Sequence, residues 1–503
     1  MRLDTGGLID RGRRIGFRFD GRALHGLGGD TLASALIANG VRLVGRSFRL
    51  HRPRGILAAG PEEPNALVGI GRGARHTPNI PATVQELIEG LEARSQNRWP
   101  SLGLDLLAVN DLLAPLLGAG FYHKTFIWPP GLWERVAEPL IRRAAGLGRL
   151  SMRPDPDGCE AAFAHCDLLV IGAGPAGLAA ALAAGRAGAR VILAEEDTLP
   201  GGRLNAERIA VGGMAWATWA AQAAAELAGL PNVRLMTRTT VFGAFDDGAF
   251  GAVERVADHL PVPRAGCPRQ TFWRIRARRS VLAAGAVERI VAFPGNDRPG
   301  VMLAGAVRTF LNRFAAAPGR RIAVFAANDD AWRTAADAGA AGLEAIMIDP
   351  RPAPGPGVPP IRGQVIRGHG VAGTTGRRGL TGIRLDDGRR IAADCLAISG
   401  GWNPAVHLAC HAGARPVWDP GIAAFLPPPT RCRGCAWPAP RPAVSPPARR
   451  WPTGRRRRSR RWPIWASPPP PHPRPNAATA PAPPARCGMS GATAPPSSTS
   501  STT

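Results

Sequence analysis

A glycine-rich motif, GAGPAG, directly follows the apolar run Leu168–Ile171. The spacing is that of a strand, a tight turn and a helix. Gly172 permits the turn, Gly174 lets a pyrophosphate approach the backbone, and Gly177 lets the helix pack closely on the strand. Phosphates are then expected at the positive end of the helix that begins near Pro175. The motif therefore predicts a dinucleotide site.

An acidic residue stands where the ribose of such a nucleotide should lie. Arg190–Glu195 is predicted as the second strand, and Glu195 lies 18 residues after Gly177. Its carboxylate can accept hydrogen bonds from the adenosine ribose hydroxyls, and it would repel the 2′-phosphate of NADP. The acid therefore favours NAD or FAD. Gly201–Gly202–Arg203 follows, and its two glycines allow a second close approach of the backbone to the cofactor.

The elements that must position these residues belong to an α/β fold. Residues 279–289 are predicted as a strand that ends at Ala283–Ala284–Gly285 and returns past the same dinucleotide. Residues 320–349 repeat the strand–helix–strand rhythm, but their turn, AANDDA, lacks the three glycines. That absence favours an inserted domain of similar fold over a second nucleotide site. Residues 393–408 are a further strand, followed by Gly400–Gly401, where the main domain is expected to resume.

The N-terminal residues indicate a small β-grasp module. Residues 14–21 alternate apolar and polar side chains as a half-buried strand does. Residues 28–40 are predicted as a short helix, with Asp30 accepting the first free amides and Gly40 in the left-handed position after the last turn. Residues 41–48 return as a strand, which completes a strand–helix–strand unit.

The segment over residues 71–150 is interpreted as a connection that packs against its neighbours. An amphipathic helix is expected from about Val84 to Arg94, and the Trp and Phe side chains of the segment are expected in the core. The β-grasp module resembles ferredoxin-like modules, and in their iron–sulfur relatives the loop that corresponds to residues 51–68 carries clustered cysteines. The first cysteine of this chain is Cys159, so no cluster is predicted.

The excess of basic over acidic residues in the chain is weak evidence for a nucleic-acid partner. The formal net charge is +26, but Lys124 is the only lysine and Tyr122 the only tyrosine. Arg, Ala, Gly and Pro have GC-rich codons, so we attribute the arginine excess mainly to nucleotide bias. The stretch over residues 453–475, TGRRRRSRRWPIWASPPPPHPRP, resembles an arm that grips phosphates and stacks on bases. If it were one, deleting the stretch would abolish binding that weakens steeply with salt.

The remaining features indicate a cytoplasmic protein without a metal site. The eight cysteines are scattered, as in a reducing compartment, and Cys432 and Cys435 form a lone pair at metal-ligand spacing. The N-terminus has no apolar core of a signal peptide. Residues 168–185 are uncharged, but their glycines favour a buried strand–turn–helix over a membrane span. No combination of side chains indicates acid–base or nucleophilic catalysis, so no catalytic residue is predicted.

Several stretches together resemble one protein family. They are FDGRALHGLGGDTLASALIANGVRLVGRSFRLHRPRG, SQNRWPSL, AGFYHKTFIWP, IRRAAGLG, GAGPAGLAAALAA, FPGNDRPGVMLAGAVRTFLNRF and ISGGWNPAVHLACH. In this combination the chain is similar to the alpha subunits of heterotetrameric sarcosine oxidases, from about residue 14 to about residue 425. The N-terminal module then resembles the ferredoxin-like unit that opens several amine-oxidising flavoprotein complexes, where it would serve in docking.

The resemblance implies a function and a set of partners. Such complexes oxidatively demethylate sarcosine to glycine, reduce oxygen to hydrogen peroxide, and can pass the one-carbon unit to tetrahydrofolate. The alpha subunit would bind NAD and assemble with beta, gamma and delta subunits, while FAD and FMN would lie mainly on the beta subunit. Carried over to this sequence, the cofactor contacts are Gly172, Gly174, Ala176 and Gly177 for phosphate, Glu195 and Glu196 for ribose, Val241 near the adenine, and Gly201, Gly202 and Arg203 in the following loop.

The sequence departs from the family after about residue 425. There the family continues into a folate-binding, aminomethyltransferase-like domain, whereas this chain becomes rich in Pro and Arg without acids or apolar periodicity. We interpret the change as a frameshifted or truncated reading of the gene and expect the tail to be disordered. The predicted organisation is a β-grasp module at 10–75, a connecting segment at 76–160, a Rossmann-type domain at 161–425 with an insert at about 318–390, and a tail at 426–503.

Two readings of function remain open at this stage. In the first, the chain is an oxidoreductase subunit, inactive alone, whose amine chemistry occurs in a partner subunit. In the second, it is a non-catalytic scaffold that binds NAD or FAD in another amine dehydrogenase or oxidase complex. The sequence does not distinguish sarcosine from another secondary amine as the substrate.

Overall fold

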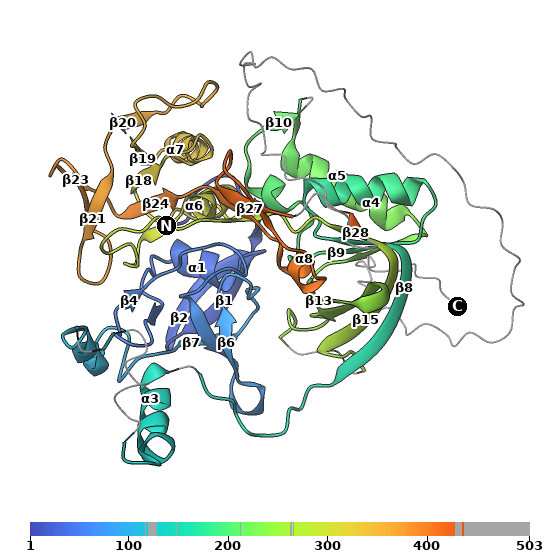
Figure 1. Ribbon diagram of the computed structural model, residues 1–503, viewed down its shortest axis with the longest axis horizontal. Helices are drawn as coiled ribbons and strands as arrows, with labels where there is room; N and C mark the ends of the chain where they lie inside the picture. The colour runs from blue at the N-terminus through green and yellow to red at the C-terminus, as the bar shows by residue number, and fades with distance from the viewer. Residues whose placement is uncertain are drawn as a thin grey trace, which may run out of the picture. The chain divides into compact units, whose positions relative to one another are not determined.

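The computed structural model describes residues 435–436 and residues 1–427, except for 116, 119–127, 147, 212, 262–263 and 265. Figure 1 shows the order of the helices and strands along the chain. The predicted tail at 426–503 lies almost entirely outside the described residues, and so does the aromatic stretch around Tyr122. Among the helices of the described residues, none combines the length and the apolar character that crossing a bilayer requires.

The N-terminal module is a five-stranded sheet with one helix packed on it. The strand order is β2–β1–β7–β5–β6, in which β1 and β7 are parallel and the other neighbours antiparallel. Helix α1 (Leu32–Ala38) packs on the sheet through Leu32 and Leu36, which are fully buried. The strands are β1 (Asp10–Phe19), β2 (Arg22–Gly28), β5 (Leu67–Ile70), β6 (Thr77–Pro81) and β7 (Leu91–Ser95). Two of them lie beyond residue 75, so the sheet extends into the segment that was predicted to be a connection.

The start of α1 differs from the prediction. Thr31, not Asp30, is the N-cap residue, because Thr31 and Ser34 exchange hydrogen bonds between side chain and backbone in a capping box. The carboxylate of Asp30 instead accepts from the Ser34 hydroxyl at 2.7 Å and from the Leu27 amide at 2.8 Å. At the other end, Gly40 has a φ of 73°, the left-handed conformation expected of it.

Two further predictions for the N-terminal half are wrong. The predicted strand over residues 41–48 is reduced to β3 (Gly45–Arg46), which pairs only with β4 (Pro53–Arg54). The predicted helix over residues 84–94 does not form. Its last four residues belong to β7, which inserts between β1 and β5 and buries every second side chain, beginning with Leu91. Pairing with two neighbouring strands overrides the helical spacing of the apolar residues.

The segment between the module and the first α/β sheet exposes two of its tryptophans, whereas Trp133 is half-buried. Trp99 is 57% exposed and Trp128 is 80% exposed, so the prediction that the aromatic side chains of this segment lie in the core is wrong for both. Leu112 and Met152 are exposed as well. The segment contains the short helices η2 (Leu106–Asp111) and η3 (Trp133–Ala137), and helix α3 (Glu138–Ala145).

The first α/β sheet has the order β12–β9–β8–β15–β14–β13. Its first four strands are parallel, and the last two extend it in antiparallel fashion. Strand β28 (Cys435–Ala436) pairs with the end of β15. The strands are β8 (Cys159–Ile171), β9 (Val191–Ala194), β12 (Val233–Met236), β13 (Thr239–Phe245), β14 (Ala249–Glu254) and β15 (Gln270–Leu282).

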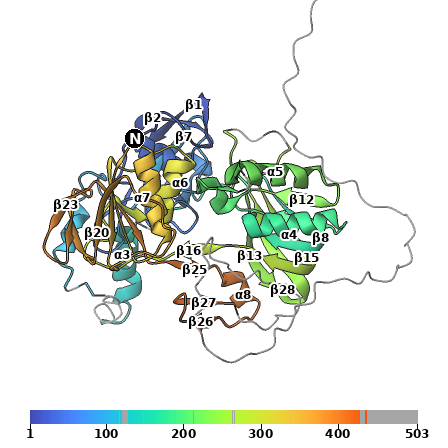
Figure 2. The ribbon, with the colours of Figure 1, turned by 90° about the horizontal axis from the view of Figure 1, so that it is seen from above.

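Two apolar cores hold this sheet. Helices α4 (Pro175–Arg186) and α5 (Trp216–Gly229) cover one face of its parallel part (Figures 1 and 2) and bury Leu178 and Leu227 against it. A second core joins the parallel strands to the antiparallel extension and includes Trp273 and Ile275 of β15. The uncharged stretch 168–185 is thus the β8–turn–α4 unit, as predicted.

A second parallel sheet follows, with the order β17–β24–β18–β19–β20. It runs from Val301 to Ser399 and so extends beyond the predicted insert at 318–390 at its start and its end. Two antiparallel crossing strands, β16 (Ala286–Glu288) and β25 (Trp402–Pro404), carry the chain into and out of this unit. Its elements are β17 (Val301–Leu303), α6 (Ala304–Asn312), β18 (Arg321–Ala326), α7 (Asp330–Ala340), β19 (Glu344–Asp349), β20 (Gly363–Arg367) and β24 (Cys395–Ser399).

The remaining described elements are small. A three-stranded antiparallel sheet, β21–β22–β23, lies between β20 and β24 in sequence. After β25 the chain forms helix α8 (His407–His411) and a short hairpin. The strands are β10 (Ala210–Val211), β11 (Met214–Ala215), β21 (Val371–Thr375), β22 (Gly382–Leu385), β23 (Arg390–Ala392), β26 (Val417–Asp419) and β27 (Ala424–Leu426).

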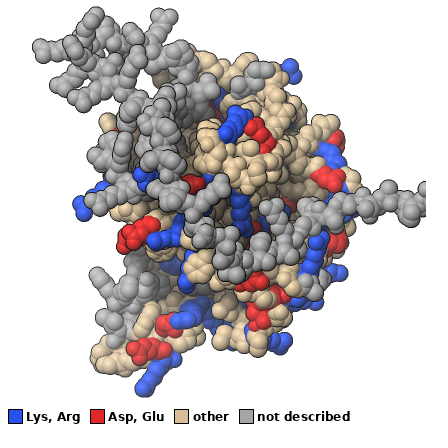
Figure 3. All heavy atoms as spheres, turned by 90° about the vertical axis from the view of Figure 1, so that its right-hand side faces the viewer, with Lys and Arg blue, Asp and Glu red and all other residues tan. Residues whose placement is uncertain are grey.

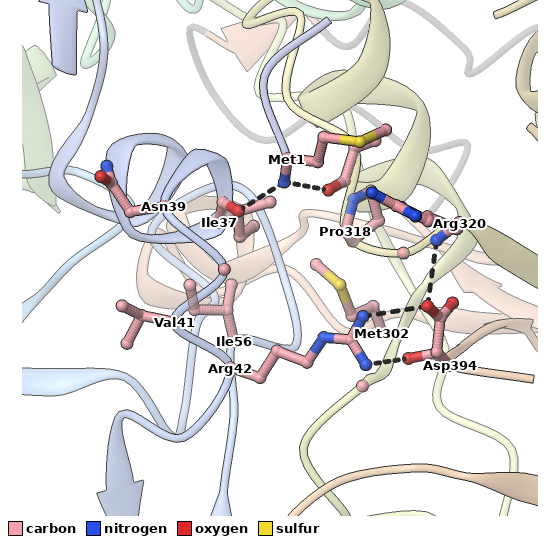
Figure 4. Close-up of a pocket in the computed structure, with 14 residues that line it drawn as sticks. Met1, Ile37, Asn39, Val41, Arg42, Ile56, Met302, Pro318, Arg320 and Asp394 are labelled. Carbon is pink, nitrogen blue, oxygen red and sulfur yellow. Dashed lines mark hydrogen bonds and ion pairs between the residues drawn. The ribbon is translucent and has the colours of Figure 1, made fainter. Parts of the chain in front are cut away.

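The N-terminal module and the second parallel unit share one hydrophobic core, which includes Leu36 of α1 and Phe310 of α6. A pocket lies at this junction (Figure 4), where Arg42 of the module donates to the Asp394 carboxylate at 3.1 Å. The same carboxylate accepts from the amide of Arg320. An ion pair between the two units therefore lines the pocket.

Candidate dinucleotide site

The glycine motif folds as the sequence predicts. Gly172 follows β8 with a φ of 96°, and a Cβ at this position would lie 2.6 Å from the carbonyl oxygen of Ala283, the residue after β15. A Cβ at Gly177 would collide with the carbonyl oxygen of Gly172. Only glycine fits at either position, because Gly172 lies against the backbone of Ala283 and Gly177 lies against the backbone of Gly172.

Gly174 is different, because nothing lies within 4 Å of the position that its Cβ would take. It is the N-cap residue of α4, and no side chain caps the helix there. Ala176 lies in the exposed first turn of the same helix. The first amides of α4 therefore border open space, which is the arrangement that binds a phosphate at the positive end of a helix.

A second loop meets this turn. Gly201 has a φ of 126° and Gly202 a φ of 51°, and a Cβ on Gly202 would lie 3.2 Å from the Cα atom of Gly174. The amide of Gly201 donates to the carbonyl oxygen of Ala173 at 2.8 Å. The two glycine loops thus form one backbone cradle beside the open space, as a pyrophosphate-binding site requires.

The acidic residues at the end of β9 lie as predicted beside this cradle. Glu195 is 7% exposed, and its carboxylate accepts from the amides of Ala173 at 2.6 Å and Asp197 at 2.9 Å. Burial raises the pKa of Glu195, although these two amides oppose the rise. Each carboxylate oxygen retains a lone pair for a further donor, such as a ribose hydroxyl.

Glu196 reaches the surface, yet neighbouring protein atoms restrict its hydration. Its pKa is raised to about 7, first by this desolvation and then by the like charges of Glu195, Asp197 and Glu62. Arg313 is the counter-ion of the group and forms a bidentate ion pair with Asp197. Three neighbouring carboxyl groups therefore gather at this end of the site, which disfavours an additional phosphate on the ribose.

Val241 belongs to a strand that starts beside Glu195, but its side chain does not face the acids. Strand β13 begins where the Thr239 amide donates to the carbonyl oxygen of Glu195 at 2.7 Å, and Val241 is two residues further along. The Val241 side chain is buried in the core between the two parts of the sheet. Any contact of Val241 with an adenine must therefore involve its backbone.

Arg203 does not extend freely from the second glycine loop. Its guanidinium donates to Glu207 at 2.8 Å and to both carboxylate oxygens of Asp330 at 2.6 Å, and it lies 4.4 Å from the ring centre of Trp402. The helical turn η4 (Gly202–Ala206) is thereby tied to α7 and β25. Arg203 connects the cradle to the second parallel unit, a role that the sequence did not indicate.

A buried ionic cluster surrounds this connection. The side chain of Arg308 is 1% exposed and pairs with Glu207 at 2.7 Å and with Asp330 at 3.4 Å. Burial alone would raise the pKa of Asp330, but Arg308 and Arg203 hold it at about 2. From the sequence, Asp330 was placed only in a turn, AANDDA, that lacks the glycines of a nucleotide site, and no role was predicted for it. Its charge is what joins α7 to the cofactor loop.

The second strand–helix–strand unit has no comparable cradle. Asp329 and Asp330 stand at the start of α7, where two carboxylates would repel a phosphate. Asp349, the acid at the end of β19, is fully buried and accepts from Trp332 at 2.9 Å and from Arg351 at 2.7 Å. The preference for a structural insert over a second nucleotide site agrees with these contacts.

Comparisons with known proteins agree with this geometry. The family model for pyridine nucleotide-disulphide oxidoreductases matches residues 166–417, which is half of the chain. The chain belongs to this oxidoreductase family. The model for a 2Fe-2S iron–sulfur cluster binding domain matches residues 12–98, a range that contains no cysteine. The predicted fold is confirmed: a ferredoxin-like module precedes a dinucleotide-binding α/β domain.

The resemblance to sarcosine oxidase alpha subunits is also confirmed for this oxidoreductase. The chain is 55% identical over 433 residues to the sarcosine oxidase subunit alpha of Rhizobium meliloti (strain 1021), which covers 85% of the chain and 44% of the relative. It is 38% identical over 436 residues to the subunit alpha of Corynebacterium sp. (strain P-1), covering 83% and 40%. The chain thus spans less than half the length of these relatives.

A solved structure has a similar fold. The L-proline dehydrogenase from P. horikoshii superimposes with a TM-score of 0.57 at 18% identity, covering 86% of this chain and 70% of that one. At this identity the similarity concerns the fold alone. It agrees with the topology described above.

Proposed function

We propose that this oxidoreductase chain binds NAD and acts as the alpha subunit of a complex that oxidatively demethylates sarcosine to glycine, with oxygen reduced to hydrogen peroxide. The observation that carries the proposal is the backbone cradle of Gly174 and Gly202 beside Glu195, in a chain that is 55% identical to a sarcosine oxidase alpha subunit. FAD and FMN would be held mainly by the beta subunit, and the complex would be cytoplasmic.

The acidic end of the site supports NAD over NADP. Glu195 can accept from both ribose hydroxyls, and a 2′-phosphate would meet the charges of Glu195 and Asp197. Bound NAD would supply a hydride acceptor. The chain itself would hold the pyrophosphate with the amides of α4 and orient the adenosine with Glu195.

Assembly with beta, gamma and delta subunits is supported by the apolar surface of the segment between the module and the first sheet. Leu104, Leu112, Leu140 and Met152 are all exposed there, in addition to Trp128. Exposed apolar side chains that recur along one segment are consistent with an interface. On the face shown in Figure 3 the basic and acidic side chains are interspersed, which does not favour a nucleic-acid partner.

The isolated chain is expected to show no sarcosine-dependent peroxide formation, because the amine chemistry would occur on the beta subunit. The assay compares the purified chain with the same chain co-expressed with beta, gamma and delta subunits. Peroxide formation only in the complex is the expected result. Turnover by the chain alone would contradict the proposal. A stable complex that binds NAD but oxidises no secondary amine would favour the scaffold reading.

Replacing Gly174 by alanine is expected to weaken NAD binding by about ten-fold or more, a loss of ~1.4 kcal/mol. The added Cβ fits the folded chain, since nothing lies within 4 Å of it, but it occupies space that a phosphate must enter. Calorimetric titration with NAD measures the loss. Gly229→Ala, which also adds a methyl group in open space but at the far end of α5, is the matched control. Undiminished NAD affinity in the Gly174→Ala variant would show that the phosphate does not bind beside Gly174.

A further inference from the structure

Glu288 lies where the ligand-binding edges of both parallel sheets meet. Strand β15 ends at Leu282, and after a three-residue turn the chain forms β16, whose last residue, Glu288, pairs with Trp402 of β25. Strand β24 of the second sheet ends at Ser399, just before β25. In α/β proteins, ligands bind outside the carboxyl ends of the parallel strands. Glu288 contacts the carboxyl end of β24 through Ser399 and follows the carboxyl end of β15 by six residues in the chain.

The carboxyl group of Glu288 is buried and held in one orientation. The residue is 7% exposed, and the amide of Gly305, in the first turn of α6, donates to it at 2.7 Å. The Ser399 hydroxyl also hydrogen-bonds to it. A Cβ on Gly305 would lie 2.9 Å from the carboxylate and 3.0 Å from the Trp402 ring. The charged groups that act on it are Asp330 of α7 and Arg203 of the η4 loop.

The geometry of the cradle gives the direction in which a bound dinucleotide must extend. Its adenosine half lies toward β9, where Glu195 is placed. In the sheet, β9 and β15 are the two neighbours of β8. A dinucleotide whose pyrophosphate lies at the end of β8 therefore extends its second half toward β15. The polypeptide continues from the end of β15 through Ala283–Gly285 to Glu288. Arg203, one of the charged groups that act on Glu288, directly follows Gly202 of the cradle.

We propose that Glu288, as a neutral carboxylic acid, donates a hydrogen bond to the carboxamide carbonyl of the nicotinamide half of bound NAD. This inference rests on the proposed NAD site and adds the residue that recognises the second half. Glu288 is thus assigned as a binding residue that holds a proton at its carboxyl oxygen. Ionised Glu288 would offer the carbonyl an acceptor in place of a donor.

The ionisation of Glu288 is suited to this role. Burial, and secondarily the like charge of Asp330, raise its pKa to about 7, against the hydrogen bonds from Ser399 and Gly305 and the charge of Arg203. The proton is therefore retained up to neutral pH and lost above it. Because only the neutral acid can donate, NAD affinity should fall as the pH rises through 7.

The test is a calorimetric titration with NAD at pH 6 and pH 8. All proteins compared carry Glu196→Gln, because the pKa of Glu196 also lies at about 7 and its ionisation would contribute to the pH dependence. With a pKa of about 7, roughly nine-tenths of Glu288 is ionised at pH 8, so the Kd of the protein with Glu288 intact should rise by about ten-fold between the two pH values. Glu288→Gln keeps a neutral donor, and its Kd should stay throughout close to the value that the protein with Glu288 intact has at pH 6. Glu226→Gln, a change of an exposed acid on α5, should retain the pH dependence.

A second measurement uses only the protein with Glu288 intact, again with Glu196→Gln, and is unaffected by any folding defect of the Glu288→Gln variant. At pH 8, NAD binding should take up close to one proton, which appears as a difference in binding enthalpy between buffers of different ionisation enthalpy. NAD binding without proton uptake, or a pH dependence that survives in a folded Glu288→Gln variant, would overturn the assignment of Glu288. No NAD binding at either pH would overturn the proposed function itself.

Discussion

Replacing Arg308 by alanine is expected to lower the free energy of unfolding by about 3–5 kcal/mol, the cost of removing one partner from a buried ion pair. Its guanidinium is almost inaccessible and is shared by Glu207, Asp330 and the hydroxyl of Thr334. Without it, the buried Glu207 and the partly buried Asp330 keep Arg203 as an ion-pair partner, while Arg333 lies 3.8 Å from Glu207. Urea unfolding followed by tryptophan fluorescence measures the loss, because Trp332 and Trp402 lie on α7 and β25 beside the cluster.

The control is Arg186→Ala, the same substitution in another helix of the α/β units. Arg186 pairs with Glu226 on the surface, where both side chains are largely exposed, so the change should cost at most about 1 kcal/mol. Arg308→Met separates charge from volume, since it keeps most of the side-chain length. If Arg308→Met is as stable as the wild type, the ion pairs do not hold the units together. In that case the loss in the alanine variant reflects packing alone.

The sequence was sufficient for the parts of the fold that depend on local chemistry. Gly172 and Gly177 are recognisable because each needs a backbone position that no other residue can occupy, and the structure shows the contact that imposes it. Glu195 is recognisable because its distance from the motif is fixed by one helix and one strand. Such features repeat in every domain of this type, so a short stretch of residues predicts them.

The features that were missed depend on contacts between distant segments. The helix predicted over residues 84–94 is in part strand β7, because β1 and β5 lie on either side of it, and neither neighbour is visible in the local pattern. Arg203 was assigned to the cofactor from its position after two glycines, but Asp330, 127 residues later, engages its guanidinium. Glu288 was not predicted as a site residue because the groups around it come from α6, β24 and β25, which are distant in the sequence.

The nucleotide preference is expected to depend on Glu195. Glu195→Ala should weaken NAD binding by roughly 10- to 150-fold, since a charged acceptor contributes about 1.5–3 kcal/mol. The wild type should prefer NAD to NADP, because the 2′-phosphate would meet the carboxylates of Glu195 and Asp197, and the variant should lose much of that preference. Calorimetric titration of both nucleotides into both proteins measures the two effects.

Two further variants separate recognition from folding. The Glu195 carboxylate also accepts from the amides of Ala173 and Asp197, so alanine removes supports of the cradle as well as the ribose contact. Glu195→Gln keeps an oxygen acceptor and removes the charge, so it should bind NAD more tightly than the alanine variant and discriminate less against NADP than the wild type. Glu344→Ala, an exposed acid at the start of β19, should change neither affinity. Tight NAD binding by a folded Glu195→Ala variant would show that the ribose does not lie at the end of β9. The proposed orientation of the dinucleotide across β8 would then be wrong as well.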